Sequence, residues 1–163
     1  MEIDMKILRW QEMPNFEIYS DQLITIVNQE LAFMKIEVTN SMINNYVKHK
    51  VMPLPVKKKY GQVHIAYLIM ISLLKSTFSM EEIKQYFQNF PIEKEYDKFC
   101  DIFWALWQKD KIDLGQGPTG TADDLQLLSG QINYLMAATI ISKFRATNLL
   151  AQKGENHAAT TSQ

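Results

Sequence analysis

The chain has 163 residues, 47% of them hydrophobic, and a formal net charge of −1. Its longest apolar stretch, residues 63–74, contains His64 and Ser72 and is far shorter than the roughly 20 residues that a membrane-spanning helix needs. The composition argues against a membrane protein. Because the single Cys100 cannot form an intramolecular disulfide and the first ten residues lack the apolar segment of a signal peptide, we expect one cytoplasmic protein with a folded core.

Charge is distributed unevenly along the chain. Residues 38–80 contain no acidic residue and six lysines, which gives this stretch a charge of +6. The remaining 11 basic and 18 acidic residues give −7. Such asymmetry indicates an anionic partner for the middle of the chain, with a solvated lysine face as the alternative.

The first predicted elements are an arm and two helices. Residues 1–19 have a mixed pattern that is expected to form an N-terminal arm. From about Asp21, with Ser20 or Asp21 as the N-cap, apolar residues recur at helical spacing: Leu23, Ile24, Val27, Leu31 and Met34. After a turn at residues 35–38, Thr39 can cap a second helix over 39–50, whose apolar face consists of Met42, Ile43, Tyr46 and Val47.

The next elements surround a predicted core helix. Pro53 and Pro55 prevent the second helix from continuing, and residues 56–60 are at most a short extended segment. Residues 62–75 are apolar almost all round, which is typical of a helix in the middle of a core. Ser79 begins a capping box that starts another helix, with an inner face of Ile83, Phe87 and Phe90.

The C-terminal part is also predicted to be helical. An apolar stripe at alternating spacings of four and three is typical of a helix-pairing seam: Ile92, Tyr96, Phe99, Phe103 and Leu106. Thr121 can cap a last helix that runs to about Gln152. The sequence thus predicts a mainly α fold with little or no β structure, divided into an arm (1–19), a helix–turn–helix DNA-binding-like domain (20–90), a helical dimerisation or effector region (91–152) and a disordered tail (153–163).

The two helices before the prolines and the lysines after them match a helix–turn–helix followed by a basic wing. Serine, asparagine and lysine side chains contact base edges or phosphates, and a helix N-terminus can bind a phosphate. Wing lysines would neutralise backbone phosphates, and an adjacent tyrosine could stack on the sugar-phosphate backbone. The candidate nucleic-acid-binding residues are Thr39, Ser41, Asn44, Asn45, Lys48, His49, Lys57, Lys58, Lys59 and Tyr60.

This segment resembles two known families. Val38-Thr39-x-x-Met42-Ile43-x-x-Tyr46, followed by Val51-Met52-Pro53-x-Pro55 and Lys57-Lys58, is similar to the MerR-type DNA-binding domain, although Asn44 stands where that family has an arginine. The whole chain, centred on residues 41–48, more closely resembles a bacterial family known as domain of unknown function 1836, itself suspected to be MerR-like. The resemblance implies a winged helix–turn–helix and a homodimer, and it names neither an effector nor an operator.

Other signals favour structural roles. Gly115-x-Gly117-x-x-Gly120 fits the dinucleotide fingerprint by letter but follows a helix and contains Pro118, so we interpret it as a connector. The aromatic residues Phe99, Phe103, Trp104 and Trp107 indicate core packing or a dimer seam, with a small-molecule effector pocket as the alternative. No histidine has a partner that indicates catalysis, and no cysteine–histidine cluster indicates a metal, so we expect no enzyme and no cofactor.

The leading hypothesis is a homodimeric transcriptional regulator that binds duplex DNA. Its 39–50 helix would read the major groove, and the wing lysines would hold the backbone. The alternative is a protein-interaction module that uses the same basic face on an acidic protein partner.

Overall fold

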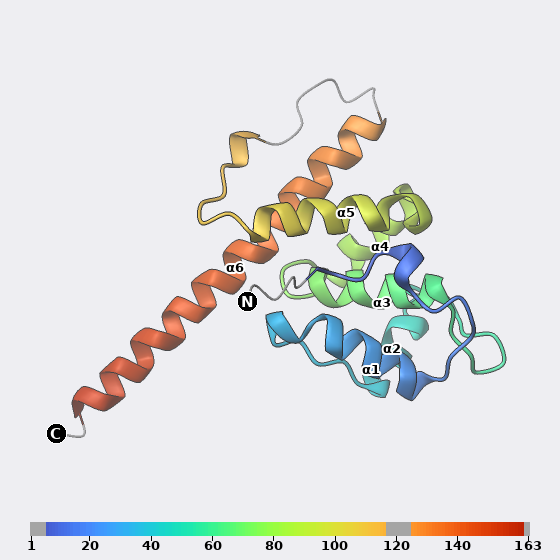
Figure 1. The fold of residues 1–163 in the computed structure, drawn as a ribbon, viewed down its shortest axis with the longest axis horizontal. Coiled ribbons are helices and arrows are strands. Elements are labelled where there is room, and N and C mark those ends of the chain that lie inside the picture. Colours follow the sequence, from blue (N-terminus) through green and yellow to red (C-terminus); the bar gives the residue numbers. More distant parts are fainter. Residues whose placement is uncertain (1–5, 117–124, 162–163) are drawn as a thin grey trace.

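Six α-helices make up most of the part of the chain that the structure describes, as the sequence predicts (Figure 1). The computed structural model describes residues 6–116 and 125–161. Within these ranges the extended segments pair only at two isolated bridges, Ile18 with Tyr60 and Val56 with Lys59. The helices are α1 (Ser20–Glu30), α2 (Asn40–Lys48), α3 (Gln62–Leu74), α4 (Met80–Asn89), α5 (Ile92–Trp107) and α6 (Leu125–Thr161).

Helix α3 lies at the centre of the fold. Its residues are buried from His64 to Leu74 except for the half-buried Tyr67, and the buried Ser72 hydroxyl donates a hydrogen bond to the Leu68 carbonyl at 2.6 Å. Helices α1, α5 and α6 all pack against it. A helix that is apolar on every face is stable only when neighbours cover it on several sides, and this arrangement provides them.

The predicted caps begin two of the helices. The Thr39 side chain accepts a hydrogen bond from the Met42 N–H, and Ser79 forms the predicted capping box with Glu82. Helix α1 begins one residue earlier than expected, at Ser20, and ends at Glu30. Met34 lies beyond α1 in a separate 3-10 helix, Ala32–Met34. The observed helix α1 is therefore shorter than the apolar pattern predicted.

The predicted pairing seam closes within one chain. The stripe residues of α5 are buried, and α5 packs along α6. A buried polar network crosses this contact: the Tyr86 hydroxyl donates to the Asn133 side-chain oxygen at 2.6 Å, and the Asn133 amide donates to the Glu95 carboxylate at 3.1 Å. The aromatic cluster also packs internally, with Trp107 between Phe33 and Phe144.

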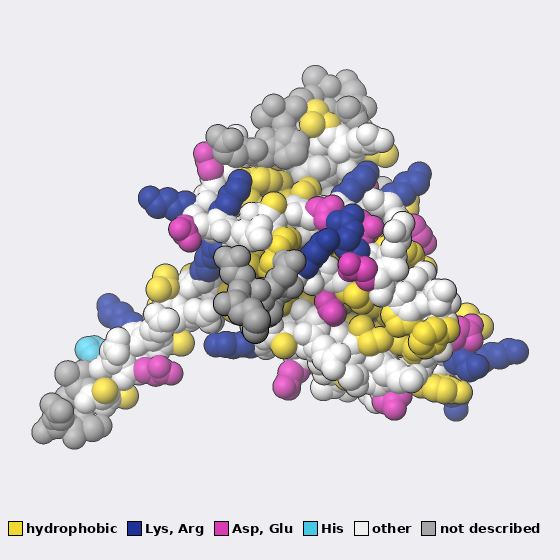
Figure 2. Space-filling view, in the orientation of Figure 1, with side chains coloured by type: hydrophobic (Ala, Val, Ile, Leu, Met, Phe, Trp, Pro, Cys, Tyr) yellow, Lys and Arg dark blue, Asp and Glu magenta, His cyan; other side chains and the backbone are white. Residues whose placement is uncertain are grey.

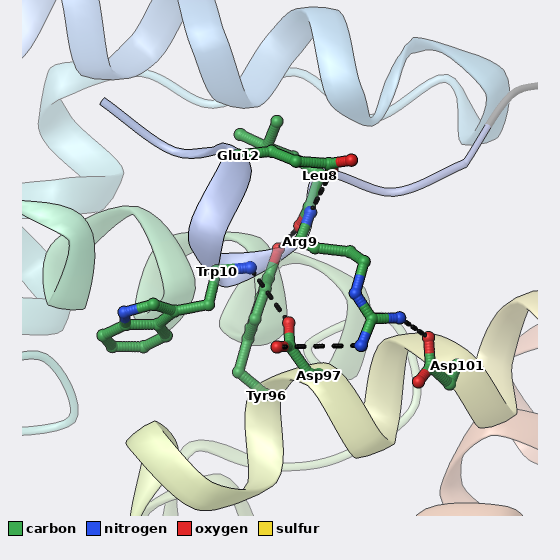
Figure 3. A network of polar contacts seen from close by, with 7 residues as sticks. All are labelled: Leu8, Arg9, Trp10, Glu12, Tyr96, Asp97 and Asp101. Carbon is green, nitrogen blue, oxygen red and sulfur yellow. Dashed lines mark hydrogen bonds and ion pairs between the residues drawn. The ribbon is translucent and has the colours of Figure 1, made fainter. Parts of the chain in front are cut away.

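The N-terminal arm is fastened to α5 (Figure 3). The Tyr96 hydroxyl donates to the Leu8 carbonyl at 2.6 Å, and the Trp10 N–H donates to Asp97 at 2.9 Å. The Arg9 guanidinium contacts Asp97 and Asp101. The same arm reaches α1, because the Leu8 N–H donates to the Glu30 carboxylate. Residues of the arm therefore belong to the same core as the helices.

Helix α6 continues further than the sequence predicts. It runs to Thr161, which corrects the expected end near Gln152 and the expected disorder from residue 153. Its outer half projects from the other helices (Figure 1), and residues 149–159 are all exposed. The expected cap at Thr121 and residues 117–120 of the glycine-rich loop lie outside the described residues. None of the helices described combines the length and apolar character needed to cross a membrane.

Candidate nucleic-acid interface

Asn28 fixes the turn between α1 and α2. The Val38 N–H donates to the Asn28 side-chain oxygen at 2.7 Å, and the Asn28 amide donates to the Val38 carbonyl at 3.4 Å. Lys35, which ends the intervening 3-10 helix, has a left-handed backbone with φ of 57°. These two features set the angle at which the chain enters α2. Sequence reasoning did not find Asn28, because its partner is ten residues away and has no local signature.

Helix α2 buries one face and exposes the other. Ile43 and Tyr46 are buried against the core, and Lys75 Nζ lies 4.8 Å from the Tyr46 ring centroid. Ser41, Asn44, Asn45 and Lys48 lie on one side of α2, because residues three or four positions apart are neighbours on a helix surface. The predicted site residues on or beside α2 are all exposed: Thr39, Ser41, Asn44, Asn45, Lys48 and His49.

The predicted wing is a tight turn at residues 56–59, which we call the lysine turn. The backbones of Val56 and Lys59 exchange two hydrogen bonds, both of 3.0 Å. Between them, Lys57 and Lys58 have φ angles of 52° and 63°. Positive φ at both central residues is the pattern of a type I′ turn, which normally contains asparagine and glycine because other residues are strained there. Both lysine side chains are exposed.

The lysine turn is tied back to the arm and to α3. Tyr60 pairs with Ile18 through two backbone hydrogen bonds of 2.8 and 2.9 Å. His64 accepts from the Gly61 N–H at Nδ1 and lies 3.0 Å from the Leu54 carbonyl at Nε2. Because Nδ1 accepts, the imidazole proton must lie on Nε2 and point at Leu54. His64 thus connects the start of α3 to the segment that precedes the turn.

Tyr60 is a correction to the predicted site. Its side chain is only 7% exposed and packs edge-on against His64, with ring centroids 5.2 Å apart. Burial raises the pKa of its hydroxyl above the ordinary value. A ring in this position is part of the core, so it cannot stack on a nucleic-acid backbone in this structure.

Exposed aromatic residues near the turn come instead from the arm, where sequence reasoning did not look. Tyr19 is 56% exposed, and Lys59 Nζ lies 5.9 Å from its ring centroid. Phe16 is 65% exposed. Figure 2 shows lysine side chains beside hydrophobic ones at the edge of the molecule where residues 56–60 lie in Figure 1. A signal was available in the sequence, because neither ring belongs to the apolar face of a predicted helix.

The lysines of the site differ in their surroundings. Lys59 is partly neutralised, because its Nζ lies 3.9 Å from the Glu17 carboxylate. The structure describes no ion pair for Lys48, Lys57 or Lys58. The described residues also contain no group of three or more histidine, cysteine or acidic side chains placed to hold a metal. The chemistry of this surface is therefore that of exposed lysine charge beside hydrogen-bonding side chains.

A family model described as "Domain of unknown function (DUF1836)" matches residues 8–102, which is more than half of the chain. The chain belongs to the DUF1836 family. The match begins in the arm, includes the whole of the candidate site and ends within α5. No curated protein and no solved structure matches the chain. The DUF1836 segment stops before α6, although α6 packs along α5.

Proposed function

We propose that the protein is a transcriptional regulator that binds duplex DNA with α2 and the lysine turn, in the manner of a MerR-like winged helix–turn–helix. One observation carries the proposal. The non-glycine residues with positive φ in the described chain are all lysines: Lys35, Lys50, Lys57 and Lys58. A left-handed backbone costs an L-residue about 1 kcal/mol or more, and glycine or asparagine would relieve it. A charged residue at a position where its backbone is strained indicates that the charge serves a function.

The position of these lysines supports an extended anion as the ligand. Three of the four lie in the acid-free stretch 38–80, and they flank α2 on its C-terminal side. Helix α2 exposes amide and hydroxyl groups that can contact base edges, with Asn44 and Asn45 at its centre. Lysines supply the phosphate contacts that do not depend on sequence. Because DNA is the proposed ligand, we also propose a cytoplasmic location.

The test is fluorescence anisotropy with labelled random-sequence duplex DNA at several salt concentrations. We expect salt-sensitive binding by the wild type. Lys57→Glu with Lys58→Glu should weaken binding to all sequences alike, because it reverses charge at the phosphate contacts. The matched control is Lys109→Glu with Lys111→Glu, which makes the same charge change at exposed residues away from α2. Equal affinity of the two double variants would show that the lysine turn does not contact DNA.

We further propose that the protein acts as a homodimer through the projecting half of α6. Leu149 and Leu150 are 66% and 73% exposed, and they belong to the half of α6 that projects from the other helices (Figure 1). Adjacent leucines on a lone helix are stabilised when a second copy covers them. A dimer would present two copies of α2 to a two-fold symmetric site.

A second candidate function is an adaptor that binds an acidic protein. The observation that favours it is the group of exposed apolar residues in and near the lysine turn: Phe16, Tyr19, Leu54 and Val56. DNA phosphates give such side chains little to bind, whereas a protein interface combines apolar anchors with a charged rim. Excess unrelated plasmid DNA should release labelled duplex under the first proposal. It should leave a captured protein partner bound under the second.

A further inference from the structure

A groove of about 560 Å³ lies next to the candidate interface, between the end of α2, the loop that follows it, α3 and α4. Its apolar wall includes Tyr67 and Phe87, whose ring centroids are 4.6 Å apart. The volume is within the range of small-molecule sites, which combine apolar walls with a few polar groups. The lining residues are Val47, Lys48, Lys50, Val51, Met52, Pro53, Leu54, Tyr67, Lys84, Phe87 and Gln88.

The charged residues that line this groove are all positive. Lys48 is the last residue of α2, Lys50 lies two residues beyond it, and Lys84 comes from α4. No acidic residue lines the groove. Outside the lining, the Glu93 carboxylate adds to burial in raising the pKa of the Tyr67 hydroxyl. An aromatic wall with lysines on two sides is complementary to a molecule that is apolar at one end and anionic at the other.

The backbone at Lys50 is a second observation at this groove. Lys50 has φ of 58° directly after α2, at a helix end where glycine is usual. Its N–H donates to the Val47 carbonyl at 3.0 Å, so the left-handed conformation is held by the helix end itself. A lysine with a strained backbone in the lining of an apolar groove is consistent with a charge that contacts a ligand.

We propose that this groove binds a small amphipathic organic anion, an aromatic or aliphatic body that carries a carboxylate, sulfonate or phosphate. The apolar body lies against Tyr67 and Phe87, and the anionic group is held by Lys84 together with Lys48 and Lys50. Since Lys48 belongs to the proposed DNA-reading face, the bound anion and DNA compete for it. This competition rests on the proposed function, whereas binding of the anion does not.

The binding test uses two probes of nearly the same shape. 8-Anilinonaphthalene-1-sulfonate carries the anionic group, and N-phenyl-1-naphthylamine lacks it. We expect saturable binding of the sulfonate at one site, with at least tenfold weaker binding of the uncharged probe. Lys50→Asn with Lys84→Gln should weaken sulfonate binding at least tenfold and leave the uncharged probe unaffected, because asparagine tolerates the backbone at residue 50.

Two controls locate the site. Lys109→Gln with Lys111→Gln removes the same charge elsewhere and should leave sulfonate binding unchanged. Loss of binding in Phe16→Ser would place the probe on the exposed patch beside the lysine turn and would overturn the proposal. Unchanged sulfonate affinity in the Lys50 and Lys84 double variant would also overturn it.

The competition is measured separately, by adding the sulfonate to the protein–DNA complex. We expect the probe to release labelled duplex from the wild type and to release less from Lys84→Gln. The latter variant alone should bind DNA as tightly as the wild type, because residue 84 lies outside the proposed DNA face. Weaker DNA binding by Lys84→Gln would make the groove part of the DNA surface and overturn its role as a separate site. Sulfonate binding without any DNA binding would contradict only the proposed function.

Discussion

At the scale of single residues, the lysines of the lysine turn lower the stability of the fold but favour the proposed DNA binding. Asparagine and glycine would fit the backbone of residues 57 and 58 with less strain than two lysines. Their replacement therefore changes stability and DNA affinity in opposite directions. Few surface positions allow a change that removes charge and at the same time improves the local fold.

We predict that Lys57→Asn with Lys58→Gly raises the free energy of unfolding by about 1 kcal/mol and weakens DNA binding. The slope of log affinity against log salt should fall by about 2, because two phosphate contacts are lost. Urea unfolding and anisotropy titration measure the two effects. A variant that is more stable and binds DNA with an unchanged salt slope would contradict the role of these lysines.

The burial of Cys100 makes the free energy of unfolding depend on pH in the alkaline range. The thiol is buried in α5, and burial raises its pKa from an ordinary value of 9.0 to about 12. The folded state thus retains the proton that the unfolded state loses. This contribution to stability is complete below about pH 9 and is lost as the pH rises from 9 toward 12.

We predict that the free energy of unfolding falls in that window by roughly 1 kcal/mol per pH unit for this group. Cys100→Ser, whose hydroxyl does not ionise there, should show a shallower decline in urea titrations at pH 8, 9 and 10. The burial of Tyr86 and Tyr96 also raises their pKa values, so part of the decline should remain in the variant. Identical pH profiles for the two proteins would assign the whole effect to other groups.

At the scale of elements, local sequence signals predicted the helices and missed what joins them. The caps at Thr39 and Ser79 could be predicted because each cap joins residues three positions apart. The contact between Tyr96 and Leu8 joins residues 88 positions apart, and no sequence pattern near either residue predicts it. Tyr60 was misassigned for the same reason, because its burial depends on pairing with Ile18.

The polar network between α4, α5 and α6 belongs to this group of unpredictable contacts. Asn133 is fully buried and is hydrogen-bonded to both Tyr86 and Glu95. A buried carboxylate or hydroxyl that loses its partner is destabilising, and more so when it is charged. The network therefore holds three helices at one relative position.

We predict that Asn133→Leu lowers the free energy of unfolding by about 2 kcal/mol or more, because it leaves Glu95 and Tyr86 without this partner. Tyr86→Phe should lower it by only about 1 kcal/mol, since Asn133 retains its bond to Glu95. Both changes are measured by urea unfolding at pH 7. If Asn133→Leu were as stable as the wild type, the network would be dispensable for the packing of α5 on α6.

At the scale of the whole molecule, the core and the projecting part of α6 have separate roles. The core extends from Ile7 to Ile141 and includes all the elements that carry the candidate interface. Among the described residues, none beyond Ile141 is buried, and residues 149–159 of the outer part are all exposed. Substitutions in the outer part can therefore affect assembly without affecting the fold of the body.

We predict that Leu149→Glu with Leu150→Glu converts a dimer into a monomer in sedimentation equilibrium and leaves the helical content of the body unchanged. Repulsion between four introduced carboxylates and the loss of apolar contact both act against association. Thr147→Glu with Gln152→Glu is the matched control, because it adds the same charge at exposed polar positions of the same helix. A wild-type chain that sediments as a monomer at high micromolar concentration would remove the dimer from the proposal.

Helix α6 also implies that one continuous helix contains two levels of local stability. Amide hydrogens near Asn133 are buried against α5 and can exchange with solvent deuterium only when the packed helices unfold. Those from Leu149 to Thr161 need only fraying of a few turns, so they should exchange orders of magnitude faster. If a binding partner slowed the exchange of the outer turns alone, that partner would be mapped to α6. No structure of the complex would be needed for this assignment.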